Sequence, residues 1–180
     1  MKIGIHQINF LPWFPFFYKM EKSDVFVLMS HCQFEKNGFQ NRANVNDQWW
    51  TLPVESGTCL IKDKKYVNGY KVSDINTQLI FAFAKVLSIN TDKIHSDFPT
   101  DKKGTDRIVE ICKKYDCYEY ITNPEATEKY LDEKVMKKNG IMITPCDVPK
   151  EYKKSLFEMF DTYGIDGTTA ILKKDFVCKT

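Results

Sequence analysis

The first 29 residues contain a strand, a helix and a second strand, and this unit restricts the fold more than any other part of the sequence. The segment from Lys2 to His6 has the pattern of a short buried strand. Pro12 stands where a helix running to about Lys22 can begin, because proline is tolerated at the first helical position. The segment from Val25 to Met29 is apolar throughout, as in strands buried on both faces. Two strands joined by one helix predict a parallel pair with a right-handed crossover.

The rest of the chain continues this alternation of helices and strands. Asn37-Gly38 predicts a hairpin turn within the stretch from Phe34 to Val45, and Trp49 to Val54 predicts a further strand. The apolar spacing predicts helices at 75–87, 106–115, 125–138 and 155–163, and short strands at 118–121 and 140–143. We therefore expect one α/β domain over residues 1–180, a three-layer sandwich with a mostly parallel, Rossmann-like sheet and a β-hairpin excursion.

Composition narrows the class of protein. Hydrophobic residues make up 43% of the chain, yet no apolar run reaches the ~20 residues that span a bilayer. His6 and Gln7 follow closely after Lys2, so no signal or transit peptide is expected and no membrane contact is predicted. With 26 basic and 24 acidic residues the net charge is +2, which is too small to indicate a general nucleic-acid-binding surface.

The six cysteines are scattered, without a C-x-x-C motif, and the three histidines are too far apart in the sequence to indicate a metal site. We expect reduced thiols in a cytoplasmic protein, with no metal and no cofactor. Cys112 lies on the apolar face of a predicted helix and is expected to be a small core residue. No P-loop and no G-x-G-x-x-G motif is present.

A first polar cluster follows the first strand and contains His6, Gln7, Asn9 and Trp13. Ligands of open α/β sheets bind outside the carboxyl ends of the strands, which is where this loop should lie. The adjoining helix N-terminus would offer free N–H groups to an anion. The alternative is structural: His6 would only end the strand, and the amides would cap the helix.

A second polar cluster follows the second strand and contains Gln33, Asn41, Arg42 and Asn44. Its position predicts that it lies beside the first cluster. Arginine occurs only at 42 and 107 among the 26 basic residues, and the others are lysines. Each arginine is therefore a candidate for bidentate binding of a phosphate or carboxylate, which lysine cannot provide. The alternative is an exposed hairpin whose amides only stabilise turns.

Several short motifs occur together in the N-terminal part of the chain, namely Gln7, Pro12-Trp13, Ser23-Asp24, Gln33-Phe34, Asn41-Arg42 and Leu52-Pro53-Val54. In these motifs the sequence resembles the WbqC-like protein family. A second patch contains Arg107-Ile108, Tyr120-Ile121, Tyr130-Leu131 and Gly140-Ile141. The chain departs from the family at Ile8, where proline is usual, at Pro15, where glycine is usual, and at Ser30-His31-Cys32, where the family has acidic residues.

This resemblance implies a transferase that attaches a small amino acid, with glycine expected, to an activated acceptor. The acceptor would be a nucleotide-linked sugar for a surface polysaccharide such as O-antigen, or a modified base in phage DNA; nucleic acid is expected only as a substrate. His6 is the candidate general base, since histidine exchanges protons near neutral pH. Asp97 is a second candidate, although it could equally cap a helix, and Arg107 is a candidate substrate-binding residue.

A non-catalytic sugar- or nucleotide-binding module is the rival hypothesis. Trp13, Phe34, Phe39, Trp49 and Trp50 could stack on a ring without performing chemistry, or they could belong to the core or to a homodimer interface.

Overall fold

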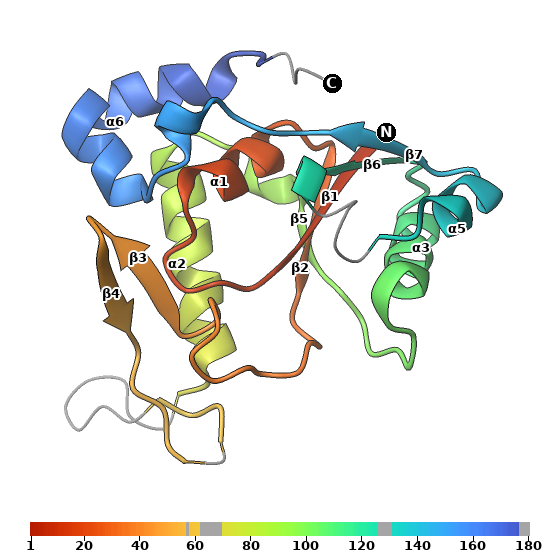
Figure 1. Cartoon of the computed structure of the whole chain (residues 1–180), viewed down its shortest axis with the longest axis horizontal. Coiled ribbons are helices and arrows are strands. Elements are labelled where there is room, and N and C mark those ends of the chain that lie inside the picture. The colour runs from red at the N-terminus through yellow and green to blue at the C-terminus, as the bar shows by residue number, and fades with distance from the viewer. Residues whose placement is uncertain (57, 62–69, 126–130, 177–180) are drawn as a thin grey trace.

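A computed structural model describes residues 1–56, 58–61, 70–125 and 131–176. Its central sheet has five parallel strands in the order β5-β2-β1-β6-β7 (Figure 1). These strands are β1 (Lys2–Gln7), β2 (Val25–Met29), β5 (Ile94–Ser96), β6 (Glu119–Thr122) and β7 (Met142–Pro145). The predicted parallel sheet is therefore confirmed.

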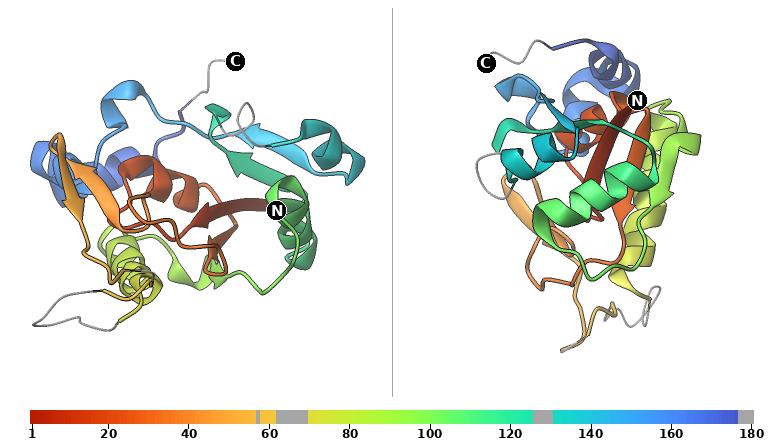
Figure 2. Two further views of the ribbon diagram at one scale, coloured as in Figure 1. Left: turned by 60° about the horizontal axis from the view of Figure 1, so that its bottom comes forward. Right: turned by 90° about the vertical axis from the view of Figure 1, so that its right-hand side faces the viewer.

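Helices cover both faces of this sheet, which gives the predicted α/β architecture. One face carries α1 (Phe14–Glu21), α2 (Val72–Val86) and α6 (Leu156–Lys173), and the other carries α3 (Gly104–Lys114) and α5 (Glu133–Lys138). The right-hand view of Figure 2 shows α3 lying in front of the strands. Short 3₁₀ turns occur at Thr91–Lys93 and Lys150–Tyr152. No helix within the described ranges is long and apolar enough to cross a membrane.

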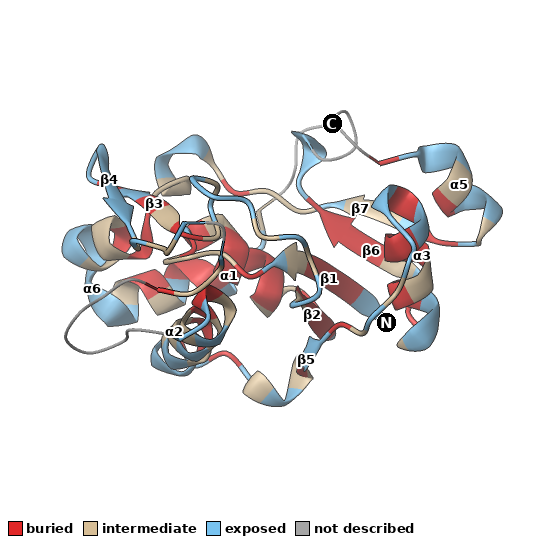
Figure 3. Ribbon diagram, turned by 90° about the horizontal axis from the view of Figure 1, so that it is seen from below, coloured by how far each residue is buried: buried red, intermediate tan, exposed pale blue. Residues whose placement is uncertain are grey.

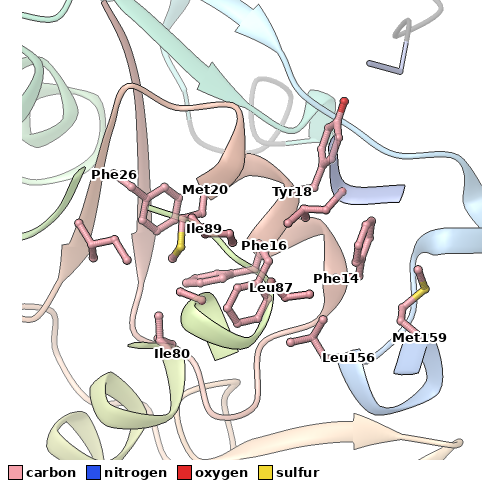
Figure 4. Packing of buried hydrophobic residues seen from close by; sticks show 14 of the residues in the cluster. Phe14, Phe16, Tyr18, Met20, Phe26, Ile80, Leu87, Ile89, Leu156 and Met159 are labelled. Carbon is pink, nitrogen blue, oxygen red and sulfur yellow. The ribbon is translucent and has the colours of Figure 1, made fainter. Parts of the chain in front are cut away.

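Two apolar clusters stabilise these layers. On the α1 face, rings from α1 pack with residues of β2, α2 and α6, among them Phe14, Phe16, Phe26, Ile80, Leu87 and Leu156 (Figure 4). On the α3 face, the cluster includes Ile3, Ile5, Val27, Ile111, Cys112 and Tyr120. The central strands are buried from both sides in Figure 3, as the apolar run from Val25 to Met29 predicts.

Strand β1 shows how the side chains divide between the two faces. Ile3 and Ile5 point to the α3 face, whereas Gly4 and His6 point to the α1 face. A Cβ atom at Gly4 would lie only 2.5 Å from Ser23 Oγ and 2.8 Å from the Phe26 ring, so only glycine allows this close approach.

The β-hairpin lies outside the main sheet and differs in position from the prediction. It pairs β3 (Arg42–Val45) with β4 (Gln48–Thr51), and its turn is at Asn46 and Asp47. Both turn residues have positive φ, 51° and 59°, as a two-residue hairpin turn of this type requires. Asn37-Gly38 was therefore the wrong turn, because a local turn signal does not ensure that its flanks form strands. The hairpin packs toward α6 through Trp50 and Phe157, whose ring centroids are 5.8 Å apart.

Other predictions agree with the structure to different extents. Helix α2 begins at Val72 rather than near residue 75, and α6 continues to Lys173 across a kink at Gly164, where φ is 67°. Among the described residues, Cys32, Cys59, Cys112 and Cys117 are free thiols, and Cys112 is fully buried as predicted. Residues 126–130 of the predicted 125–138 helix, including Tyr130, and Cys178 lie outside the described residues.

Candidate functional site

The carboxyl ends of the parallel strands meet along one edge of the sheet, and the loops that follow them carry most of the predicted site residues. β1 ends at Gln7, β2 at Met29 and β5 at Ser96. Gln7 is paired with Met29, and Asp97 N donates a hydrogen bond to Leu28 O (3.0 Å). These contacts place the ends of β1, β2 and β5 next to one another.

The best-connected polar group at this edge comprises Ser30, His31, Asp97 and Arg107, which we call the Asp97 cluster. One oxygen of Asp97, Oδ1, accepts hydrogen bonds from Ser30 N (2.8 Å), Ser30 Oγ (2.9 Å), His31 N (3.1 Å) and His31 Nδ1 (2.9 Å). The other oxygen, Oδ2, accepts a short hydrogen bond from Arg107 Nη2. Arg107 Nη1 also donates to His31 O (3.2 Å). The loops after β2 and β5 are thereby joined to helix α3.

The ion pair within this cluster is buried. The Asp97 side chain is fully inaccessible to solvent, and that of Arg107 is 11% exposed. Burial alone would raise the pKa of Asp97, but hydrogen bonds from His31, Ser30 and Arg107 outweigh it and lower the pKa below its ordinary value. Asp97 therefore remains an anion that orients the groups around it. Arg107 Nε is buried without a partner.

His31 was not predicted, and it has the geometry of a proton-transfer residue. Because a carboxylate can only accept, its Nδ1 carries the hydrogen that is donated to Asp97, and Nε2 is left as the basic nitrogen. The side chain is 43% exposed, so Nε2 can reach a bound substrate. The signal in the sequence was that Ser30-His31-Cys32 replaces acidic residues common in the WbqC-like family.

His6, the predicted base, lies on the opposite face of the sheet, against α1. Its ring is 4.8 Å from that of Phe16, and its Nδ1 donates to Gln7 O (3.0 Å). Burial, together with the nearby charge of Lys19, lowers the pKa of His6 from 6.5 to about 4. A histidine with this pKa is neutral at physiological pH, and this environment favours His31 over His6 for proton transfer.

Mild acid is expected to destabilise the protein through His6. The folded pKa of about 4 lies below the ordinary value of 6.5, so between these values the unfolded chain binds more protons. The stabilisation is complete above pH 6.5 and is lost as pH falls toward 4, by about 3 kcal/mol at most, since one pKa unit corresponds to about 1.4 kcal/mol. Denaturant unfolding at a series of pH values from 7 to 4 measures this loss in the free energy of unfolding. His6→Gln should flatten the curve, whereas replacing the exposed His95 should not; equal curves for both variants would contradict the assignment.

The two predicted loops lie in contact. Phe10 N donates to Phe39 O (2.8 Å), and the buried Asn76 of α2 donates to Gln40 O (2.7 Å) and more weakly to Ile8 O (3.4 Å). Asn9 Oδ1 and Asn76 Oδ1 are buried there without partners. The two loops are thus adjacent, although the residues of the first cluster are divided, with His6 and Gln7 on opposite faces of β1.

Arg42 lies on β3 and stacks on the hairpin. Its guanidinium carbon is 4.3 Å from the centre of the Trp49 ring, and its Nε is buried without a partner. Asn41 is 1% exposed and binds Asn37 N (2.8 Å) and Leu52 O (3.1 Å), so its side chain holds the loop together. The remaining predicted residues, Gln33, Asn44 and Trp13, are exposed.

The N-terminus of α1 does not offer the free anion site that the sequence suggested. Phe14 N donates to Lys154 O (2.9 Å), Phe16 N donates to Trp13 O (3.1 Å), and Trp13 forms an isolated bridge with Ser155. The segment preceding α6 therefore covers this helix end. That expectation was wrong because only tertiary contacts decide whether a helix terminus is accessible.

Two open cavities lie outside the Asp97 cluster. One of about 140 Å³ is bordered by Tyr18, Ile121 and Cys146, and one of about 410 Å³ by Thr122, Lys137 and Ile143. Neither cavity is bordered by a member of the Asp97 cluster. Within the described part of the chain, no group of three or more His, Cys, Asp or Glu side chains could hold a metal ion.

Comparisons with known proteins connect the chain to one protein family and to one curated relative. The model of the WbqC-like protein family matches residues 7–71 and 66–163. The uncharacterized protein Rv1507c of Mycobacterium tuberculosis is similar, at 23% identity over 202 residues, covering 85% of this chain and 86% of that protein. No solved structure matches the chain. Because the family model covers well over half of its residues, the chain belongs to the WbqC-like protein family.

Proposed function

We propose that this protein is a transferase that joins a small amino acid, with glycine as the first candidate, to an activated acceptor bearing a pyrophosphate or nucleotide group. The observation that carries the proposal is the exposed His31 held through Nδ1 by the buried Asp97. A carboxylate that orients an imidazole in this way is the arrangement used for general-base catalysis in many enzymes. Membership of the WbqC-like family agrees with a role in making modified sugars or bases.

The proposed reaction needs one proton acceptor and one group that binds an anion. The amino nitrogen of the amino acid forms a bond to the activated carbon of the acceptor. The bond from that carbon to oxygen breaks, and pyrophosphate or the nucleotide leaves with the electron pair. His31 Nε2 takes the proton that the amine loses, and Asp97 stabilises the imidazolium that forms. The free thiols of Cys32, Cys59, Cys112 and Cys117, among the described residues, support a cytoplasmic location for this chemistry.

Arg42 is our candidate for the residue that binds the leaving group, together with the amides of the neighbouring loop. Stacking on Trp49 fixes the plane of its guanidinium, and a planar guanidinium can donate to two phosphate oxygens at once. Among the described residues, the buried Nε of Arg42 has no hydrogen-bond partner. A lysine presents all its donors from one compact ammonium nitrogen and lacks this planar fork.

Arg42→Lys is expected to weaken the binding of inorganic pyrophosphate about 10- to 100-fold, or roughly 1.5–3 kcal/mol, while the fold stays intact. Titration calorimetry on both proteins measures the affinity, and thermal melts check the fold. Lys36→Gln is the matched control, because it removes an exposed positive charge from the neighbouring loop. Equal weakening in both variants would mean that charge alone, and not the arginine geometry, attracts the ligand.

A transfer assay tests the function itself. Labelled glycine is incubated with the protein and either a nucleotide-linked sugar or DNA that carries a pyrophosphorylated base. We expect label to enter one acceptor with release of an equal amount of nucleotide or pyrophosphate. Binding of the acceptor without turnover, across a panel of amino acids, would contradict the enzyme proposal.

The rival proposal, a non-catalytic binding module, is favoured by one observation. Phe39 and Trp49 are 62% and 50% exposed, their rings are 6.1 Å apart, and Arg42 stacks on the same Trp49. Exposed rings beside an arginine suit a ligand with a flat ring. The transfer assay separates the two hypotheses, because a binding module would retain the acceptor unchanged.

A further inference from the structure

The carboxyl edge of the sheet contains a topological switch point beside β1, and we call the place where β1 and β6 are no longer paired, beyond Gly4 and Ile121, the gap. After β1 the chain places β2 and β5 on one side of β1, and β6 and β7 on the other. Ligands of open α/β sheets bind at this kind of switch point, outside the carboxyl ends of the strands. Pairing of β1 with β2 continues to Gln7 and Met29, whereas pairing of β1 with β6 ends at Gly4 and Ile121. The two central strands therefore separate just before their carboxyl ends.

A buried lysine from α1 occupies this gap. Lys19 Nζ donates to Ile5 O (2.8 Å), the first residue of β1 beyond its pairing with β6. The same nitrogen lies 5.5 Å from the centre of the Tyr120 ring, which belongs to the core on the other face. Lys19 is only 7% exposed, and among the described residues it forms no ion pair with a carboxylate.

A second donor lies at the end of the neighbouring strand. Thr122, the last residue of β6, is 1% exposed, and its Oγ1 has no hydrogen-bond partner among the residues that the structure describes. A buried hydroxyl without a partner is unfavourable, as is a buried ammonium without a counter-ion. The ends of β1 and β6 thus carry two polar groups that can donate hydrogen bonds, beside a neutral His6, and both lack the anion that would satisfy them.

We propose that this gap binds the carboxylate of a small amino acid, with Lys19 Nζ as its cation and Thr122 Oγ1 as a second donor. Two features of the gap favour a carboxylate over a phosphate. The donors are almost completely buried, which admits only a small group, and one ammonium matches the single charge of a carboxylate. The claim that this amino acid is also the one transferred rests on the proposed function. The claim that it binds in the gap does not depend on that function.

A structural role for Lys19 makes a different prediction about stability. If Lys19 served mainly to join β1 to α1 through Ile5 O, methionine at this position would lower the melting temperature. Burial lowers the pKa of Lys19 from 10.5 to about 8, which means that the fold disfavours the charged amine. A methionine of similar length removes that unfavourable charge, so we expect Lys19→Met to melt at or above the temperature of the wild type.

Calorimetry with glycine, glycinamide and acetate tests the site in the intact protein. Glycine should bind, and glycinamide, which lacks the carboxylate, should bind at least 10-fold more weakly. Lys19→Met should lose glycine binding at least 10-fold without a drop in melting temperature, and Thr122→Val should weaken it in the same direction. Lys22→Met is the matched control: Lys22 lies on the same helix but is paired with Asp175, so this variant should bind glycine like the wild type.

The possible outcomes separate this proposal from the transfer proposal. Glycine affinity that is unchanged in Lys19→Met, or no glycine binding by the wild type, overturns the site. Binding of pyrophosphate but not glycine in a Lys19-dependent way also overturns it, because the gap would then hold the leaving group. Lys19-dependent glycine binding without any transfer would leave the site standing and reject the transferase. Normal transfer by Lys19→Met would reject the Lys19 site and leave the transferase proposal standing.

Discussion

His31→Asn is expected to slow amino-acid transfer about 100- to 10,000-fold, the usual contribution of a general acid–base residue. Asparagine keeps a donor that can reach Asp97 but has no basic nitrogen in the place of Nε2. The loss should therefore appear in kcat, with little change in KM. Steady-state kinetics over a range of pH, with the acceptor identified by the transfer assay, measures both effects.

His95→Asn is the matched control for this prediction. His95 lies on β5, two residues before Asp97, and is exposed, with its ring 5.2 Å from that of Tyr115. It has no hydrogen bond to a carboxylate among the described residues, so its replacement should leave the rate unchanged. Full activity in His31→Asn would remove His31 from the reaction. Joint loss of activity and of a cooperative thermal melt would assign it a structural role.

The fold was predictable because its strongest signals are local. The apolar run of β2 matches the predicted bounds, and the βαβ unit fixed the parallel pairing of β1 with β2. The hairpin was misplaced because the Asn37-Gly38 signal was stronger than that of Asn46-Asp47, although only the second has strands on both sides. Helix α6 was cut short because its apolar period is interrupted at Gly164.

The candidate site was less predictable, since it depends on contacts between distant segments. Asp97 and Arg107 could be named from the sequence, but their pairing and their contact with the loop after β2 depend on the order of strands in the sheet. Lys19 has the appearance of a surface lysine on an amphipathic helix. Its burial follows from the separation of β1 from β6, which no local pattern encodes.

Asp97→Ala is expected to lower the free energy of unfolding by about 3–5 kcal/mol, because it leaves the guanidinium of Arg107 buried without its counter-ion. Ser30 and His31 would lose their common acceptor in the same step. Denaturant unfolding at neutral pH measures the change. Asp101→Ala is the matched control, since Asp101 is exposed in the following loop, and it should alter stability by no more than about 0.5 kcal/mol.

A double-mutant cycle identifies the ion pair as the origin of this loss. Arg107→Met removes the charge that Asp97→Ala would leave unpaired, so the double variant should lose less stability than the sum of the two single variants. Strictly additive losses would show that Asp97 acts through Ser30 and His31 instead. Acid should reproduce the effect in the wild type: the lowered pKa of Asp97 means that its stabilisation is complete above its ordinary value of 3.8 and is lost as pH falls below it. This loss occurs at lower pH than that of His6, so His6→Gln should retain it and Asp97→Ala should not.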